Sequence, residues 1–217
     1  MKTGFLYRNS LSIAFITLFF LAMIAQVYFG WKENSKDYEE AGKTLALSSY
    51  LFSGHFIAAT FENFQSEFLQ MAMYVFVTIY LRQQGSAESK KIGVQEEVDR
   101  EPIPHENAPY PVKKGGFILK IYENSLTIAF LFLFLLSAGF HFYGSFHNYK
   151  AEQLLAGKPD LTLLQFINEP RFWFETFQNW QSEFLSVASI VILSIFLRQK
   201  GSPESKPVDS PNSETGK

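Results

Sequence analysis

Two long segments of the chain have nearly the same sequence, and this repetition constrains the fold more than any other feature. Thr60–Arg82 reads TFENFQSEFLQMAMYVFVTIYLR, and Thr176–Arg198 reads TFQNWQSEFLSVASIVILSIFLR. Each segment contains about the 20 residues that a helix needs to span the hydrocarbon core of a bilayer. The repetition therefore predicts two equivalent membrane-spanning helices, one carrying Glu67 and the other Glu183.

Two further apolar segments complete the predicted membrane region. Leu11–Trp31 and Leu126–Phe146 contain no Asp, Glu, Lys or Arg and are of spanning length. Together with the repeated segments they predict an all-α, polytopic membrane protein with four transmembrane helices.

The first apolar segment is also repeated, which gives the predicted architecture. Tyr7–Phe15 (YRNSLSIAF) returns as Tyr122–Phe130 (YENSLTIAF), and an internal copy argues against a cleaved signal peptide. The chain thus reads as two copies of a two-helix unit. Because each copy crosses the membrane an even number of times, the copies are expected to be parallel and related by a pseudo-twofold axis along the membrane normal.

The predicted boundaries follow from these copies. Residues 1–90 form the first repeat and residues 117–206 the second. Between them, residues 91–116 mix both charge signs with several prolines, which predicts a mostly disordered cytoplasmic linker. Residues 207–217 are expected to be a disordered tail.

The distribution of Lys and Arg predicts the orientation. Thirteen of these residues lie in the N-terminal segment, the middle connection and the C-terminal segment, against six in the other two loops. Since basic residues favour the cytoplasmic side, both termini are expected there. The two outer loops contain the apolar stretches 45–52 and 161–167, which are expected to lie on the membrane as short helices. Thr60 and Thr176 are then expected to be the N-caps of the following long helices.

Composition and missing motifs exclude several classes of function. The formal net charge of -2 gives no basic surface for nucleic acid, and the absence of cysteine excludes disulfides and thiolate metal sites. There is no Walker loop, dinucleotide fingerprint, HExxH or GxSxG. We therefore expect no enzyme activity, no cofactor and no metal site, with the lipid bilayer as the main partner and a protein or a second copy as further candidates.

Polar residues follow one face of each repeated helix and form the candidate site. They share a face because they are spaced i, i+3, i+4 and i+7. The first set is Asn63, Ser66, Glu67 and Gln70, and the second is Asn179, Ser182, Glu183 and Ser186. Two hypotheses stay open: the two carboxylates share a proton or cation, or both polar faces simply hold helices together.

His55 and Arg171 precede these helices at equivalent positions and are candidates for an outer gate. They can pair with Glu67 or Glu183 and close a polar chamber, or they can face lipid head groups. The sequence alone leaves both interpretations open.

Several motifs resemble an uncharacterised family of bacterial integral membrane proteins with a domain of unknown function. These motifs are ATFENFQSEFLQMAMYV and LRQQGSAESK in the first half, and RFWFETFQNWQSEFL and LRQKGSPESK in the second. The resemblance covers nearly the whole chain, with departures such as Phe64, where a tryptophan is common. It implies a bacterial inner-membrane protein and supplies no activity, ligand or catalytic residue.

Two functions remain as expectations. The first is a structural or interaction protein of the bacterial inner membrane. The alternative is a small transporter, channel or proton- or cation-coupled component that uses the pair of membrane-embedded glutamates.

Overall fold

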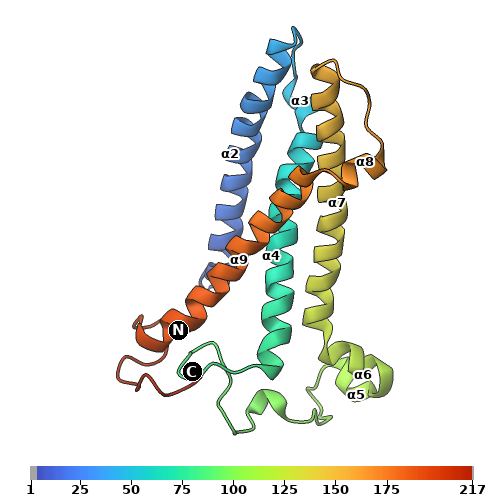
Figure 1. Ribbon diagram of the computed structural model, residues 1–217. Helices are drawn as coiled ribbons and strands as arrows, with labels where there is room; N and C mark the ends of the chain where they lie inside the picture. The colour runs from blue at the N-terminus through green and yellow to red at the C-terminus, as the bar shows by residue number, and fades with distance from the viewer. Residues whose placement is uncertain (1–3, 217) are drawn as a thin grey trace. The chain divides into compact units, whose positions relative to one another are not determined.

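The computed structural model describes residues 4–216, and its regular elements are all helices (Figure 1). The four long helices are α2 (Ser10–Glu40), α4 (Gly54–Tyr80), α7 (Ser125–Leu155) and α9 (Pro170–Phe196). The short ones are α1 (Phe5–Arg8), α3 (Leu47–Tyr50), η1 (Glu97–Asp99), α5 (Tyr110–Lys114), α6 (Gly116–Glu123) and α8 (Leu163–Ile167). No strand occurs in residues 4–216, so the all-α class is confirmed.

Three of the long helices, α2, α7 and α9, are long and apolar enough to cross a membrane. Helix α4 has 27 residues, as many as α9, but its second half has Tyr74 and Tyr80 where α9 has Ile190 and Phe196, which lowers its mean hydropathy. Three candidate spans in the described residues are compatible with a membrane protein.

Burial in this structure is the reverse of that in a soluble protein. Among the described residues, fourteen buried residues are polar or charged and six are apolar. Large apolar side chains point outward instead, and Phe15, Ile24 and Phe29 on α2 are each 66% exposed. Water disfavours such a surface strongly, whereas lipid chains solvate it at no cost.

The described chain forms two compact units. Unit 1 contains the residues up to Phe61 together with Gly139–Phe172, and unit 2 contains Glu62–Ala138 together with the residues from Trp173 onward. Each unit thus combines residues from both halves of the sequence.

In unit 1, helices α4 and α7 approach so closely that their backbones touch at glycines. A Cβ atom added to Gly54 would lie 2.3 Å from the backbone nitrogen of Asn148, and one added to Gly144 would lie 2.4 Å from that of Ala58. Small residues permit this approach between helices in membranes.

The long helices begin six residues before the predicted N-caps. Helix α4 starts at Gly54 and α9 at Pro170, so Thr60 and Thr176 are interior residues and the N-cap prediction is wrong. Proline is favoured at the first position of a helix because it lacks an N–H that would be unsatisfied there. Thr60 instead accepts a 3.2 Å hydrogen bond from Gln26 of α2.

In unit 2, the loops that follow α4 and α9 fold in the same way. In each, the amide after the arginine donates to the second serine of the motif at 2.9 Å, and the glutamate amide donates to the first serine at 3.1 Å. The residues concerned are Gln83, Ser86, Glu88 and Ser89 in the first loop and Gln199, Ser202, Glu204 and Ser205 in the second. Gly85 and Gly201 have φ values of 83° and 86°, which glycine adopts without strain.

The C-terminal tail has a defined course against the first of these loops. The amide of Gly85 donates to the Thr215 hydroxyl at 2.8 Å, and the amide of Gly216 donates to the carbonyl of Ser86 at 2.9 Å. We expected a disordered tail because its composition is polar and rich in proline. The sequence contained no signal for these long-range bonds.

Candidate functional site

The first polar face, on α4, divides into a buried and an exposed part. Ser66 and Gln70 are buried, whereas Asn63 and Glu67 are exposed. The Ser66 hydroxyl donates to the carbonyl of Asn63 at 2.8 Å, and the Gln70 amide donates to the backbone carbonyl of Glu183 at 3.0 Å. Gln70 therefore links α4 to α9 within unit 2.

The second polar face, on α9, directs its hydroxyl groups to the helix itself. Ser182 donates to the carbonyl of Asn179 at 2.9 Å, and Ser186 donates to that of Ser182 at 3.1 Å. Both serines are exposed, while Asn179 and Glu183 are half-buried. The hydroxyls of this face thus satisfy their hydrogen-bonding capacity locally, as is usual for serine inside a helix.

Glu67 and Glu183, the predicted carboxylate pair, both lie in unit 2. Gln70, three residues after Glu67, is hydrogen-bonded to the backbone of Glu183, so the two glutamates lie at neighbouring levels of α4 and α9. Two carboxylates in this relation can share a proton or hold a cation. The bond from Gln70 goes to the backbone carbonyl of Glu183 and not to its carboxylate.

Two further acids of unit 2, Glu62 and Glu175, were missed by the sequence analysis. Carboxylate oxygens of the two lie within 4.8 Å of each other, and Asn179 donates hydrogen bonds to the Glu62 carboxylate and to the Glu175 carbonyl. The repeat comparison passed over these acids because their aligned positions hold Gln178 and Ala59. The sequence feature that could have pointed to these acids is the i and i+4 spacing of Glu175 and Asn179, which places both on one face of the helix.

His55, the first gate candidate, lies in unit 1 between two other residues of that unit. Its Nε2 atom is 3.1 Å from a carboxylate oxygen of Glu33 on α2, and its Nδ1 atom is 3.2 Å from the hydroxyl of Tyr50. His55 therefore contacts Glu33 and Tyr50, and not the glutamates with which it was predicted to pair. Burial and the nearby charge of Glu33 raise the pKa of Tyr50 to about 12, so its hydroxyl stays protonated at physiological pH.

Arg171, the second gate candidate, also lies in unit 1 and pairs with Glu152 at 2.6 Å. Glu152 accepts a second bond, at 2.8 Å, from Asn148. His55 and Glu152 line one pocket of about 230 Å³. Its polar wall includes Asn34, Asp37, His55, His147, Asn148 and Glu152. The two gate candidates thus belong to the surroundings of a polar pocket that the sequence did not predict.

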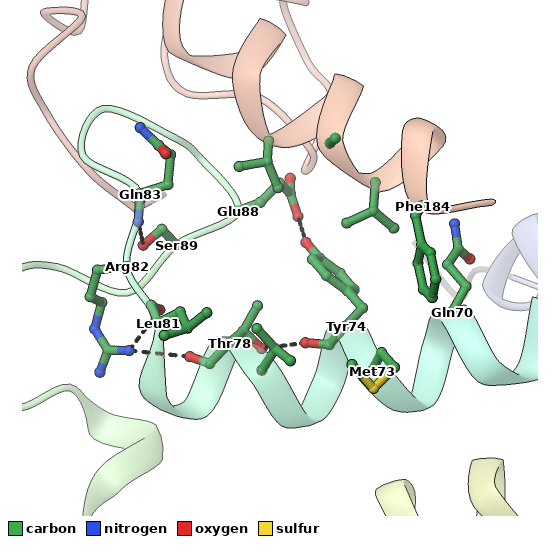
Figure 2. Close-up of a pocket in the computed structure, with 14 residues that line it drawn as sticks. Gln70, Met73, Tyr74, Thr78, Leu81, Arg82, Gln83, Glu88, Ser89 and Phe184 are labelled. Carbon is green, nitrogen blue, oxygen red and sulfur yellow. Dashed lines mark hydrogen bonds between the residues drawn. The ribbon is translucent and has the colours of Figure 1, made fainter. Parts of the chain in front are cut away.

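A larger, mainly apolar pocket of about 390 Å³ lies in unit 2 between α4 and α9 (Figure 2). Its apolar wall includes Met73, Val77, Leu81, Phe184, Val187 and Val191. Tyr74 and Glu88 point toward one another in this pocket, and the Tyr74 hydroxyl donates to the Glu88 carboxylate. The volume and the few polar groups are typical of a site for a small molecule, for which volumes of about 300–1,000 Å³ are usual.

Comparison with known proteins identifies the family. The family described as Domain of unknown function (DUF6766) matches residues 2–217. The chain belongs to this family. No curated protein and no solved structure matches this DUF6766 chain. The resemblance to a family with a domain of unknown function is therefore confirmed.

Proposed function

We propose that this chain is a structural or interaction protein of the bacterial inner membrane. It crosses the bilayer four times as two parallel two-helix repeats, with both termini in the cytoplasm. The equal lengths of α2 and α7, at 31 residues, and of α4 and α9, at 27, support the repeats. The matching bonds of the two loops support them too, and the Lys and Arg distribution supports the orientation.

The hydrogen bond from Gln70 to the carbonyl of Glu183 carries the structural role. It uses a buried polar side chain to join one long helix to another. In a bilayer, apolar side chains gain little from packing against protein rather than lipid, so polar links and close backbone packing hold helices together. The hydroxyls of Ser66, Ser182 and Ser186 donate to backbone carbonyls of their own helices and need no ligand.

Replacing Gln70 tests this role. Gln70→Leu keeps the approximate volume and removes the bond to α9, so we expect a loss of about 1 kcal/mol, or roughly 3 °C in the melting temperature in detergent. Ser186→Ala is the matched control, since its hydroxyl is exposed and bonds only its own helix. Equal melting temperatures for Gln70→Leu and the native protein would contradict the structural role.

The neighbouring positions of Glu67 and Glu183 on α4 and α9 favour a second candidate function, a small proton- or cation-coupled transporter or channel component. The half-buried position of Glu183 supports it, because carboxylates at membrane depth are costly and are usually retained for function. Asn63 and Asn179 would then be supporting ligands for the ion.

This second candidate predicts the stability of the double variant Glu67→Gln with Glu183→Gln. If the pair serves a proton or cation, the variant should melt at the same temperature as the native protein or higher at pH 7, because it removes repulsion between like charges. The measurement is thermal unfolding in detergent from pH 5 to 8. A markedly lower melting temperature at pH 7 would assign the carboxylates to packing and exclude this candidate.

A further inference from the structure

The pocket between α4 and α9 combines an apolar wall with one acid, and this combination restricts its ligand. Glu88 extends from the loop after α4 into the pocket, where it accepts the hydrogen bond from Tyr74 (Figure 2). A carboxylate offers about four acceptor positions, so Glu88 can accept N–H groups of a ligand while it keeps Tyr74. The acid favours a cationic ligand group over an anionic one.

The other charged residue of the pocket, Arg82, lies at the end of α4. Its guanidinium donates to the carbonyls of Thr78, Ile79 and Leu81 at 3.3, 3.1 and 2.9 Å. These carbonyls form the negative end of the helix dipole and hold the arginine side chain in place. Figure 2 shows the guanidinium against the helix end and directed away from the Glu88 carboxylate, so Arg82 leaves Glu88 as the acid that a ligand meets in the pocket.

The apolar part of the pocket is open toward the outer surface of unit 2. Met73, Leu81 and Phe184 line it and are 44%, 66% and 42% exposed. In a chain with such apolar outer surfaces, these side chains face lipid, so a ligand can enter the pocket sideways from the bilayer. The ligand that fits has an apolar chain and an amine.

We propose that this pocket binds an aminophospholipid. The start of one acyl chain lies against Val77, Phe184 and Val187, and the primary ammonium donates to Glu88. This inference rests on the bilayer location in the proposed function. Tyr74 acts as a positioning residue, because its hydroxyl fixes the Glu88 carboxylate.

The test places the full chain in nanodiscs with equal parts of phosphatidylethanolamine, phosphatidylcholine and phosphatidylglycerol that carry the same acyl chains. Lipids that remain bound to the purified protein are counted by mass spectrometry. Because a hydrogen bond to a charged group discriminates by about tenfold, we expect roughly ten times more phosphatidylethanolamine than phosphatidylcholine. Phosphatidylcholine carries the same charge without an ammonium N–H, so it isolates the contribution of the hydrogen bonds.

Two variants and one control locate the binding. Glu88→Gln should reduce the preference for phosphatidylethanolamine about tenfold. Ala188→Phe places a large side chain in the apolar part of the pocket, where the acyl chain would lie, and should reduce the binding of every lipid. Glu101→Gln removes the same charge at an exposed linker position and should change nothing. If Glu88→Gln does not fold, the Ala188→Phe result alone decides the location.

Different results would contradict the lipid site and the membrane location. Equal retention of the three lipids by the native protein, a preference for phosphatidylglycerol, or unchanged retention by Ala188→Phe would overturn the lipid site alone. Failure of the chain to enter nanodiscs would overturn the membrane location as well.

Discussion

Gly144→Ala should lower the melting temperature of the purified protein by roughly 8 °C. The added methyl group would lie 2.4 Å from the backbone nitrogen of Ala58 and 2.9 Å from the backbone carbon of Ile57. Both atoms belong to the backbone of α4, so no rotation of a side chain can relieve the clash, and α4 and α7 must separate within unit 1. Overpacking of this kind costs about 3 kcal/mol, and each kcal/mol corresponds to a few degrees in a chain of this length.

Two further glycines make the measurement specific. Gly54→Ala should be similarly destabilising, because its methyl group would lie 2.3 Å from the backbone nitrogen of Asn148. Gly139 is on α7 as well, but nothing lies within 4 Å of an added Cβ there. Gly139→Ala should therefore raise the melting temperature by about 2 °C through its better helix propensity. Equal effects of Gly144→Ala and Gly139→Ala would contradict the close approach of the two helices.

Lys206→Met should release the C-terminal tail from the loop after α4. Lys206 is 2% exposed, and its ammonium lies within hydrogen-bond distance of four backbone carbonyls, at 2.6 Å from Gly85, 2.7 Å from Glu214 and 3.2 Å from Pro211 and Asn212. Burial of the amine lowers its pKa. Methionine fills a similar volume but removes this donor. The Pro211 carbonyl keeps the bond from the Glu214 amide, whereas a carbonyl left unsatisfied costs about 1–3 kcal/mol when it stays buried.

Limited proteolysis measures this release. A protease that cleaves after acidic residues can cut the tail at Glu204, Asp209 or Glu214, and its rate follows the population of the open form. We expect the cleavage rate to rise at least about tenfold for Lys206→Met, since each 1.4 kcal/mol corresponds to a factor of about ten. Lys200→Met is the control, because Lys200 is an exposed lysine of the same tail. An unchanged rate for Lys206→Met would show that other contacts hold the tail.

Much of the helical architecture could be predicted from the sequence. Runs of apolar residues of about 20 positions have few stable solutions other than a spanning helix, so α2, α7 and α9 were predictable from length and hydropathy. The helix starts were predicted less well. Thr60 and Thr176 had the residue type of an N-cap, but residues from position 54 and from position 170 continue the helices without interruption.

The candidate site was predictable only as a list of residues. Periodicity placed Gln70 and Glu67 on one face of α4, yet one is buried against α9 and the other is exposed. Glu62 and Glu175 come together because Asn179 joins them, and they lie 113 residues apart in the sequence. The apolar pocket around Glu88 likewise depends on how the loop after α4 returns over the helix.

The sequence by itself determined the family, the apolar helices and the local folding of the two LRQxGSxESK loops. These depend on composition and on hydrogen bonds between residues that are near in the chain. The tertiary structure decided which partner each polar side chain meets. Lys90 and Lys206 occupy the same place in the two loops, but Lys90 forms an ion pair with Asp99, whereas Lys206 is enclosed by carbonyl groups of the tail and the opposite loop. Equal local sequences fold equally, but long-range contacts depend on chain segments that the two loops do not share.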